Sequence, residues 1–280
     1  MKDLVLAPLR GITDVVFRNA FQHHFTGVAQ AVAPFVTSVG GRRIKPSHLC
    51  DLAPADNRWM PVVPQILSRD SDAFICLANT LVDLGYNEIN WNLGCPYPMV
   101  AKKMRGSGLL CHPQRIDRML DRIVAGVKAK ISVKTRLGRF SADEMDHLIP
   151  VFNRYPIARV IVHPRTGIQM YDGSVDLPAF GRCLQAIAHP VIYNGDIITA
   201  GDLERLEGMF PEVSGWMLGR GLIADPFLAE RIRNPGQAIA RPRERFAAFH
   251  AELLAAYENR FAGPGHVLDR MKGGSEISIA

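Results

Sequence analysis

Eight short apolar runs recur along this chain, and they limit its possible folds more than any other feature. They are 4–9, 27–35, 61–67, 87–93, 130–137, 158–165, 190–197 and 214–221. Each is rich in β-branched residues and has the length of a strand. Most begin as continuous apolar sequence, which is typical of parallel strands buried on both faces.

The segments between these runs are long enough for helices, and three of them have a clear helical pattern. Apolar residues recur at helical spacing in 70–85, 113–129 and 199–210. Pro113 suits a first helical turn, Thr199 suits an N-cap, and Gly85 suits a helix end.

Eight strands alternating with helices predict a (β/α)8 TIM barrel, an α/β fold, over residues 1–236. The alternative is an open doubly wound sheet. We prefer the barrel because the strand count reaches eight and no G-x-G-x-x-G follows a strand. Residues 241–263 read as a further helix, so 237–280 are expected to begin a small C-terminal helical domain. The last eight residues, 273–280, are not expected to continue a helix.

Composition excludes several classes of protein. Hydrophobic residues make up 48% of the 280, which is ample for a core and excludes disorder as the main state. No apolar stretch approaches the roughly 20 residues of a membrane span, and the N-terminal run is too short for a signal peptide. We therefore expect a cytoplasmic protein that does not bind membranes. Its net charge of +6 fits an anionic partner. We expect a monomer.

Cysteine and histidine spacing predicts no structural metal and no disulfide framework. The five cysteines are odd in number and include no C-x-x-C pair. No set of His, Asp and Glu has metal-ligand spacing, so we expect no metal. His23 and His24 are interpreted as surface residues.

Polar residues follow nearly every predicted strand. They include Arg10, Gln65, Asn92, Cys95, Lys134, Arg136, His163, Arg165, Asn194, Asp196 and Arg220. In a barrel these positions converge on one mouth, where barrel enzymes keep their active sites. The sequence therefore predicts an active site there.

Cys95 is the strongest candidate for chemistry. It lies between Gly94 and Pro96, in a turn that should expose the thiol just beyond a strand. A thiol with a pKa near 8.5 can donate a proton around neutral pH, or act as a nucleophile once deprotonated. The other four cysteines lack this context and are interpreted as small buried residues.

Lys134 and His163 are polar residues inside apolar strands. A lysine there has no water unless its tip reaches a cavity or an anion. Both can donate hydrogen bonds to an electron-rich ring or a phosphate. Glycines at 194–197 and 218–221 close two consecutive strands, where barrels often bind phosphate, and Arg220 adds a charge. Cationic loops at 40–46 and 102–110 could contact a phosphate backbone.

Six motifs together resemble the tRNA-dihydrouridine synthase family over about residues 4–270. They are LAPLRGITD (6–14), NLGCPYP (92–98), VKTRLG (133–138), VHPRTGIQMYDG (162–173), NGDI (194–197) and LGRG (218–221). The resemblance implies an FMN-containing barrel with a C-terminal helical domain. It also implies an oxidoreductase that uses NADPH to reduce a specific uridine of tRNA to 5,6-dihydrouridine.

The resemblance also implies roles for individual residues. Hydride passes from reduced flavin to uracil C6, and Cys95 gives a proton to C5. The residues implied to bind the cofactor are Ala7, Pro8 and Leu9 along the ring, Gln65, Lys134 and His163 bonded to it, and Asn194, Gly195, Asp196, Gly219 and Arg220 around the phosphate. Those implied to bind the uracil are Asn92 and Arg165. The cations of the loop 102–110, Lys102, Lys103 and Arg105, are the candidates for contact with the RNA backbone.

Two departures from the family pattern stand out. Leu9 occupies a position where the family more often has methionine, which is a mild apolar exchange. The C-terminal helical domain is shorter than is usual for the family, so we expect an intact flavin site but reduced tRNA docking and some uncovered apolar surface on 244–262.

Two other functions stay open at this point. One is a flavin enzyme acting on a free pyrimidine, of the dihydroorotate or dihydropyrimidine dehydrogenase type. The other is a tRNA-binding protein without turnover. Comparing the turnover of tRNA with that of orotate or free uracil distinguishes the first alternative from a tRNA reductase. The second predicts RNA binding that does not depend on Cys95.

Overall fold

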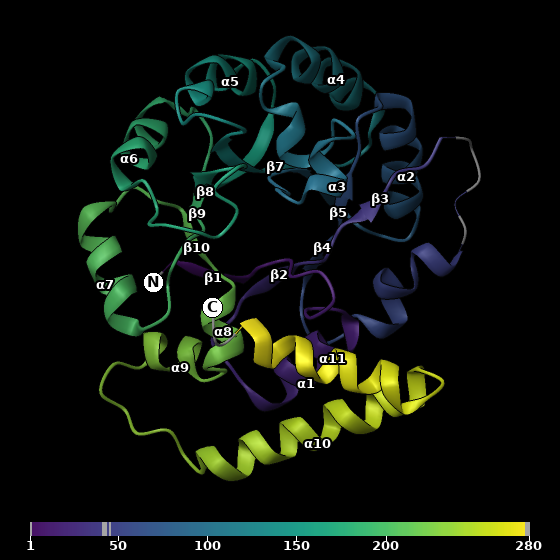
Figure 1. The fold of residues 1–280 in the computed structure, drawn as a ribbon, viewed down its shortest axis with the longest axis vertical. Helices are drawn as coiled ribbons and strands as arrows, with labels where there is room; N and C mark the ends of the chain where they lie inside the picture. Colours follow the sequence, from purple (N-terminus) through teal and green to yellow (C-terminus); the bar gives the residue numbers. More distant parts are fainter. Residues whose placement is uncertain (1, 41–43, 45, 278–280) are drawn as a thin grey trace.

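The strands of the computed structural model, which describes residues 2–40, 44 and 46–277, curl into a barrel (Figure 1). All strand pairs are parallel, in the order β3-β5-β6-β7-β8-β9-β10-β1-β2-β4. The strands are β1 (Asp3–Leu6), β2 (Gln30–Val32), β3 (Val36–Thr37), β4 (Val62–Val63), β5 (Gln65–Leu67), β6 (Glu88–Leu93), β7 (Lys130–Gly138), β8 (Ile157–Thr166), β9 (Val191–Tyr193) and β10 (Gly215–Leu218).

Two interrupted strands close the ring. β2 and β3 belong to one extended stretch broken around Pro34, and β4 and β5 to another broken at Pro64. Proline has no N–H to give to the ladder, so a break there is expected. β2 pairs with β4 at Ala31 and Val62, while β3 pairs with β5 at Val36 and Ile66. The strand order begins with β3 and ends with β4, and the two stretches that contain them pair with each other on both sides of their breaks. The strands therefore form a closed ring. The predicted (β/α)8 barrel is confirmed, and each apolar run overlaps at least one of its strands.

Helices surround the strands (Figure 1). They are α1 (Val15–His24), α2 (Ser71–Asp83), α3 (Pro98–Ala101), α4 (Pro113–Gly126), α5 (Glu144–Asn153), α6 (Leu177–Ala186), α7 (Ala200–Met209), α8 (Arg220–Ala224) and α9 (Leu228–Arg233). The three predicted helices are confirmed as α2, α4 and α7. Thr199 caps α7 in a capping box with Asp202, and Pro113 opens α4. Between β3 and β4 the described residues form only 3-10 turns, η1 (Pro46–His48), η2 (Cys50–Leu52) and η3 (Pro54–Asp56).

Side-chain alternation divides the barrel interior into an apolar part and a polar part. Val5, Val32, Val63, Ile161, Ile192 and Met217 form an inner apolar cluster with Ala7. Gln65, Asn90, Asn92 and Ser132 are also buried, on β5, β6 and β7. The intervening residues, such as Trp91 and Val133, pack in the core cluster shared with the helices. The polar part leads up to the strand ends where the active site is predicted.

The C-terminal helices α10 (Pro242–Arg260) and α11 (Pro264–Ile277) lie side by side against the barrel, α10 on α1 and α11 on α8 (Figure 1). Phe249, Leu253 and Tyr257 are buried there, so much of the apolar surface on 244–262 is covered.

The expectation that 273–280 would not continue a helix was wrong as far as Ile277, where α11 ends. Residues 278–280 lie outside the described part. A helical glycine costs about 1 kcal/mol relative to alanine, and tertiary contacts commonly override such propensities. Here Val267 is buried and Met271 packs on the core.

Within the described residues, no helix has the length and apolar character that crossing a membrane requires.

Candidate active site

A cavity of about 300 Å³ opens at the carboxyl ends of the strands. Its lining includes twelve of the residues predicted from the sequence: Ala7, Pro8, Leu9, Asn92, Cys95, Lys134, His163, Asn194, Gly195, Asp196, Gly219 and Arg220. It also includes Arg10 and Arg136, which were expected at the barrel mouth without an individual role. The remaining lining residues were not predicted individually: Phe35, Gly94, Pro96, Tyr97, Tyr171, Ile197, Ile198, Met217 and Gly221. Gln65, Arg165, Lys102, Lys103 and Arg105 are not among the lining residues.

The loop that carries Cys95 is held by hydrogen bonds on both sides of the thiol. The N–H of Cys95 donates to Asn92 Oδ1 at 2.9 Å, and its carbonyl accepts from Ser107 N at 3.0 Å. Arg136 Nε donates to the carbonyl of Gly94 at 3.0 Å. Gly106 allows this approach because it has a φ of +54°, and a Cβ there would lie 2.7 Å from the Cys95 carbonyl oxygen. The loop therefore fixes where the thiol points.

A chain of buried amides anchors this loop to the barrel interior. Asn92 Oδ1 accepts from Gly94 and Cys95, so its Nδ2 donates to Gln65 Oε1 at 2.7 Å. Gln65 Nε2 donates to Asn90 Oδ1 at 2.8 Å, and Asn90 Nδ2 donates to Ser132 at 3.0 Å. Because the Gly94 and Cys95 N–H groups can only donate, the oxygen of the Asn92 amide must face them. This orientation decides which atom donates and which accepts in each further bond of the chain. Gln65 thus lies beneath the cavity with both amide atoms already bonded.

The Cys95 thiol faces the cavity and is only 8% exposed, so the turn exposes it less than the sequence predicted. Burial raises the pKa of the thiol, and the Tyr97 backbone N–H opposes this rise together with the positive charges of Arg136, Arg10 and Lys134. The net effect keeps the proton on sulfur at neutral pH. A protonated thiol inside a cavity is suited to donate a proton rather than to attack as a nucleophile.

Three basic groups from β7 and β8 face the cavity beside this thiol. Desolvation and the neighbouring Arg136 lower the pKa of Lys134 to about 7, and no described carboxylate pairs with its ammonium. Desolvation lowers the pKa of Arg136 to about 10 and that of His163 well below its ordinary value. Arg165 Nη1 lies 3.2 Å from His163 Nε2, and an arginine can only donate. The neutral His163 ring therefore carries its proton on Nδ1.

Asp196, just after β9, is turned toward cations at the ends of β8 and β10. Arg165 binds both of its carboxylate oxygens, at 2.9 and 2.6 Å, and Arg220 binds Oδ1 at 3.1 Å. Its φ of +42° is left-handed. A carboxylate repels phosphate, so any contact of Asp196 with an anion must come through its backbone N–H. Asn194 Nδ2 donates to the Met217 carbonyl at 2.9 Å and so joins β9 to β10.

Arg165 lies deeper than the sequence suggested. Its guanidinium is almost fully buried and also donates to the carbonyl of Gly173. Tyr171, from the same segment, lies between two cavity cations, with its ring 5.3 Å from Arg136 and 5.4 Å from Arg220. Tyr171 lies in the motif VHPRTGIQMYDG and Arg136 lies in the motif VKTRLG. These two motifs were therefore the sequence signal for the two residues.

The cationic residues expected to bind RNA lie outside the cavity wall. Lys102 and Lys103 are exposed just after α3, and Arg105 donates to the Ser38 carbonyl at 3.3 Å. They follow β6 on the same side of the barrel as the cavity. Most of the other cationic loop, residues 41–43 and 45, lies outside the described part of the chain.

Comparison with solved structures shows the same fold. The old yellow enzyme from Trypanosoma cruzi superimposes with a TM-score of 0.60, covering 89% of this chain and 93% of that one, at 11% identity. This likeness supports the barrel described above.

Comparison with known sequences gives the family. The tRNA-dihydrouridine(16) synthase of Cupriavidus necator is 32% identical over 83% of this chain and 74% of its own length. A probable tRNA-dihydrouridine synthase of Rhodobacter capsulatus is 26% identical over 93% of this chain and 82% of its own length. The profile described as Dihydrouridine synthase (Dus) matches residues 5–263. This chain therefore belongs to the dihydrouridine synthase family.

Proposed function

We propose that this protein is an oxidoreductase that reduces a uridine of tRNA to 5,6-dihydrouridine, with FMN as its cofactor and NADPH as the reductant. Family membership supports the reaction. The observation that carries the mechanism is the Cys95 thiol, which lines the cavity beside Lys134 and Arg136 and has a raised pKa.

The residues of the cavity fit a flavin. Ala7, Pro8, Leu9 and Met217 supply an apolar wall for a flat ring, and Lys134 supplies a cation that lacks a carboxylate partner among the described residues. When bound, a reduced flavin supplies the hydride that uracil C6 accepts. Lys134 and His163 would hold the ring. The phosphate end would lie among Asn194, Gly195, Asp196, Gly219 and Arg220.

Cys95 holds the proton that the reaction needs at uracil C5. Because its pKa is raised, the thiol keeps this proton at neutral pH until a more basic carbon forms next to it. The anionic thiolate that remains is stabilised by Arg136, Arg10 and Lys134. Donation and stabilisation thus come from the same corner of the cavity.

Asn92 and Arg165 are proposed to orient the uracil, Asn92 directly and Arg165 through His163 and Asp196, which line the cavity. Gln65 is proposed to act through Asn92. The side chain of Asn92 lines the cavity while its amide holds the Cys95 loop. Any contact it makes with a base is therefore coupled to the position of the thiol. Lys102, Lys103 and Arg105 are proposed to meet the RNA backbone, where cations contribute salt-dependent affinity.

A comparison of wild-type protein with Cys95→Ala and Cys95→Ser tests this proposal. We expect all three to retain FMN and to oxidise NADPH anaerobically. We expect tRNA reduction by Cys95→Ala to fall by about 10²–10⁴, the usual contribution of a positioned acid. Flavin absorbance measures cofactor binding, and dihydrouridine in unmodified tRNA measures turnover.

Three results would contradict the proposal. Equal tRNA reduction by Cys95→Ala and wild type would remove the proton-donor role. Faster turnover of free uracil or orotate than of tRNA would indicate a free-pyrimidine enzyme. A protein that cannot be reconstituted with FMN, yet binds tRNA in a salt-dependent manner, would be a binding protein without turnover.

A further inference from the structure

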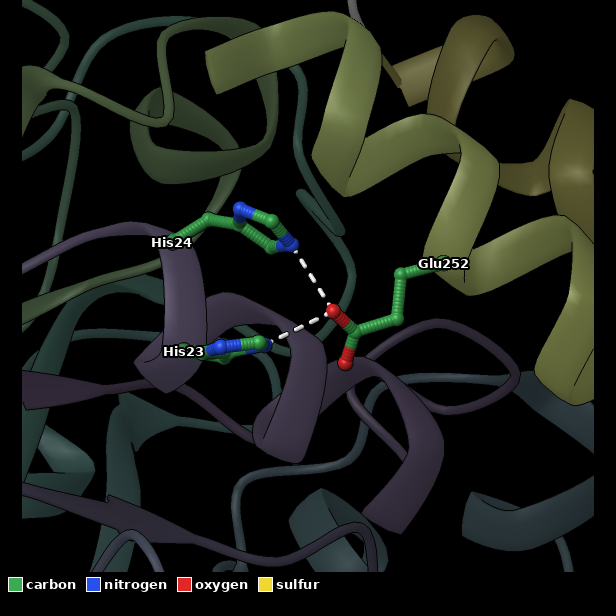
Figure 2. A group of neighbouring side chains, drawn as sticks. All are labelled: His23, His24 and Glu252. Atoms are coloured by element: carbon green, nitrogen blue, oxygen red, sulfur yellow. Dashed lines mark hydrogen bonds and ion pairs between the residues drawn. The ribbon is translucent and has the colours of Figure 1, made fainter.

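Two histidines at the end of α1 share one carboxylate oxygen with the C-terminal helix α10. His23 Nδ1 and His24 Nε2 each lie 2.8 Å from Glu252 Oε2. Figure 2 shows the three side chains converging from the two helices. Their ligand atoms all lie within 4.8 Å of one another. Sequence spacing predicted no metal site because Glu252 lies more than two hundred positions from the histidines.

His24 is held in place by packing as well as by its contact with Glu252. The His24 side chain is 15% exposed, and its ring meets Phe249 of α10 edge-on at 6.1 Å. Arg245 of α10 donates to the His24 carbonyl at 2.6 Å. Because Phe249 and Glu252 are three residues apart on α10, they share a face of that helix. His24 therefore lies in the contact between α1 and α10, called the helical seam below, and is not the surface residue that the sequence suggested.

The group has the composition and spacing of an open transition-metal site. Two imidazoles and a carboxylate suit Zn²⁺, Co²⁺ and Ni²⁺, whereas Mg²⁺ and Ca²⁺ prefer oxygen alone. Ligand atoms at 2.0–2.2 Å from a tetrahedral ion lie roughly 3.3 Å apart. The two N···O distances of 2.8 Å need to lengthen by only a fraction of an ångström. The two ring nitrogens, which lie within 4.8 Å of each other, must move closer, and the exposed His23 ring is free to rotate for this.

Electrostatics also favours a cation at this point. Without an ion, both rings must direct an N–H at the same oxygen. A cation would replace those two protons and bind both ring nitrogens as lone-pair donors. His23 and His24 occupy the last turn of α1, where the helix dipole favours positive charge. The side chain of His23 is 71% exposed and that of Glu252 39% exposed, so water can fill a fourth position.

We propose that His23, His24 and Glu252 bind one divalent transition-metal ion of the Zn²⁺ type, which fastens α10 to α1. The site lies on the helical seam, away from the cavity residues, and the inference does not depend on the proposed activity.

Metal titration of the chelator-treated protein tests the site. Calorimetry with Zn²⁺ measures affinity, and Co²⁺ absorption reports the ligand type, because thiolate ligation gives a strong near-ultraviolet band that His and Glu ligation lacks. The variants are His23→Ala and Glu252→Gln. His23 is exposed, so its removal leaves the seam packing intact. His250→Ala, an exposed histidine on the same helix, is the matched control.

We expect saturable one-to-one binding by wild type and by His250→Ala, with tetrahedral Co²⁺ bands and no thiolate band. Loss of an outer partner alone weakens metal sites by 10- to 100-fold, so loss of a ligand should cost at least about tenfold in both variants. Zn²⁺ should raise the thermal midpoint of wild type, and not that of the variants, by mass action. Equal affinity in all four proteins, a thiolate-dominated Co²⁺ spectrum, or no saturable binding would overturn the proposal and leave a hydrogen-bonded seam.

Discussion

Replacing Lys134 with methionine should stabilise the cofactor-free protein. Lys134 lies in the cavity wall, where burial and Arg136 lower its pKa from 10.5 to about 7. At 1.36 kcal/mol per pKa unit, this difference corresponds to at most about 5 kcal/mol of unfavourable energy in the charged form. Methionine has a similar unbranched length and no charge, so the substitution removes that energy without opening a large cavity.

The measurable gain should be smaller than this limit. The cavity admits solvent, and effective dielectric values near 20 describe such sites better than dry-protein values. We therefore expect a gain of about 2 kcal/mol at pH 6, or roughly 4–8 °C in the thermal midpoint of a domain of this size. Lys130→Met is the matched control, since Lys130 is exposed at the start of the same strand and should change stability by less than about 0.5 kcal/mol.

The pH dependence distinguishes a charge effect from a packing effect. Between about pH 7 and 10.5 the unfolded lysine keeps a proton that the folded lysine has lost. The unfolded state then binds more protons, so this group makes wild-type stability rise with pH over that range. Lys134→Met lacks this contribution. The gap between variant and wild type should be widest below pH 7 and should close toward pH 10.5.

Thermal melts or denaturant titrations of the three proteins from pH 6 to 9.5 measure this gap. A gap that is absent, or that stays constant with pH, would refute the assignment of a desolvated cation at Lys134. The same variant should retain less FMN, because the proposed ring contact is lost. A stability gain accompanied by a cofactor loss would show that the cation is kept for function.

Three further substitutions test other parts of the structure. Gly106→Ala places a Cβ 2.7 Å from the Cys95 carbonyl at a left-handed φ. In steady-state assays tRNA reduction should fall by at least about tenfold, while flavin absorbance is kept. Unchanged turnover would contradict the argument that this loop fixes the thiol. Arg245→Met leaves the carboxylate of buried Glu230 without its cation and should cost about 3 kcal/mol in denaturant titrations, whereas a loss under 1 kcal/mol would mean that water replaces it. Thr199→Ala removes the α7 cap and should cost about 1 kcal/mol with normal activity, and a larger activity loss would contradict its placement away from the cavity.

The barrel could be predicted because each strand carries its own local signal. Period and length in runs such as 130–137 and 158–165 identify strands without knowledge of their neighbours. The cavity followed from the same signal, because parallel strands bring their carboxyl ends to one mouth and alternation turns every second residue inward. Lys134 and His163 were found in this way.

Depth along the barrel axis could not be predicted from the sequence. Gln65 and Arg165 end strands in the expected way, yet Gln65 lies in the amide chain below the cavity and Arg165 is bound to Asp196. Their positions depend on strand register and on partners supplied by other strands. The seam of His24, Arg245 and Glu252 joins segments more than two hundred residues apart, so no local pattern could indicate it.

The chain of buried amides and the group of basic side chains above it have different functions in this barrel. The amide chain from Asn92 to Ser132 is neutral and fully bonded, so it can hold the Cys95 loop still at little electrostatic cost. The basic groups above it repel one another, and the described carboxylate that faces them, Asp196, is bound to Arg165 and Arg220. A site with a rigid acid beside unbalanced positive charge is complementary to an electron-rich ligand. An anionic ring in the cavity would raise the pKa of Lys134, so such a ligand would favour the charged lysine near pH 7.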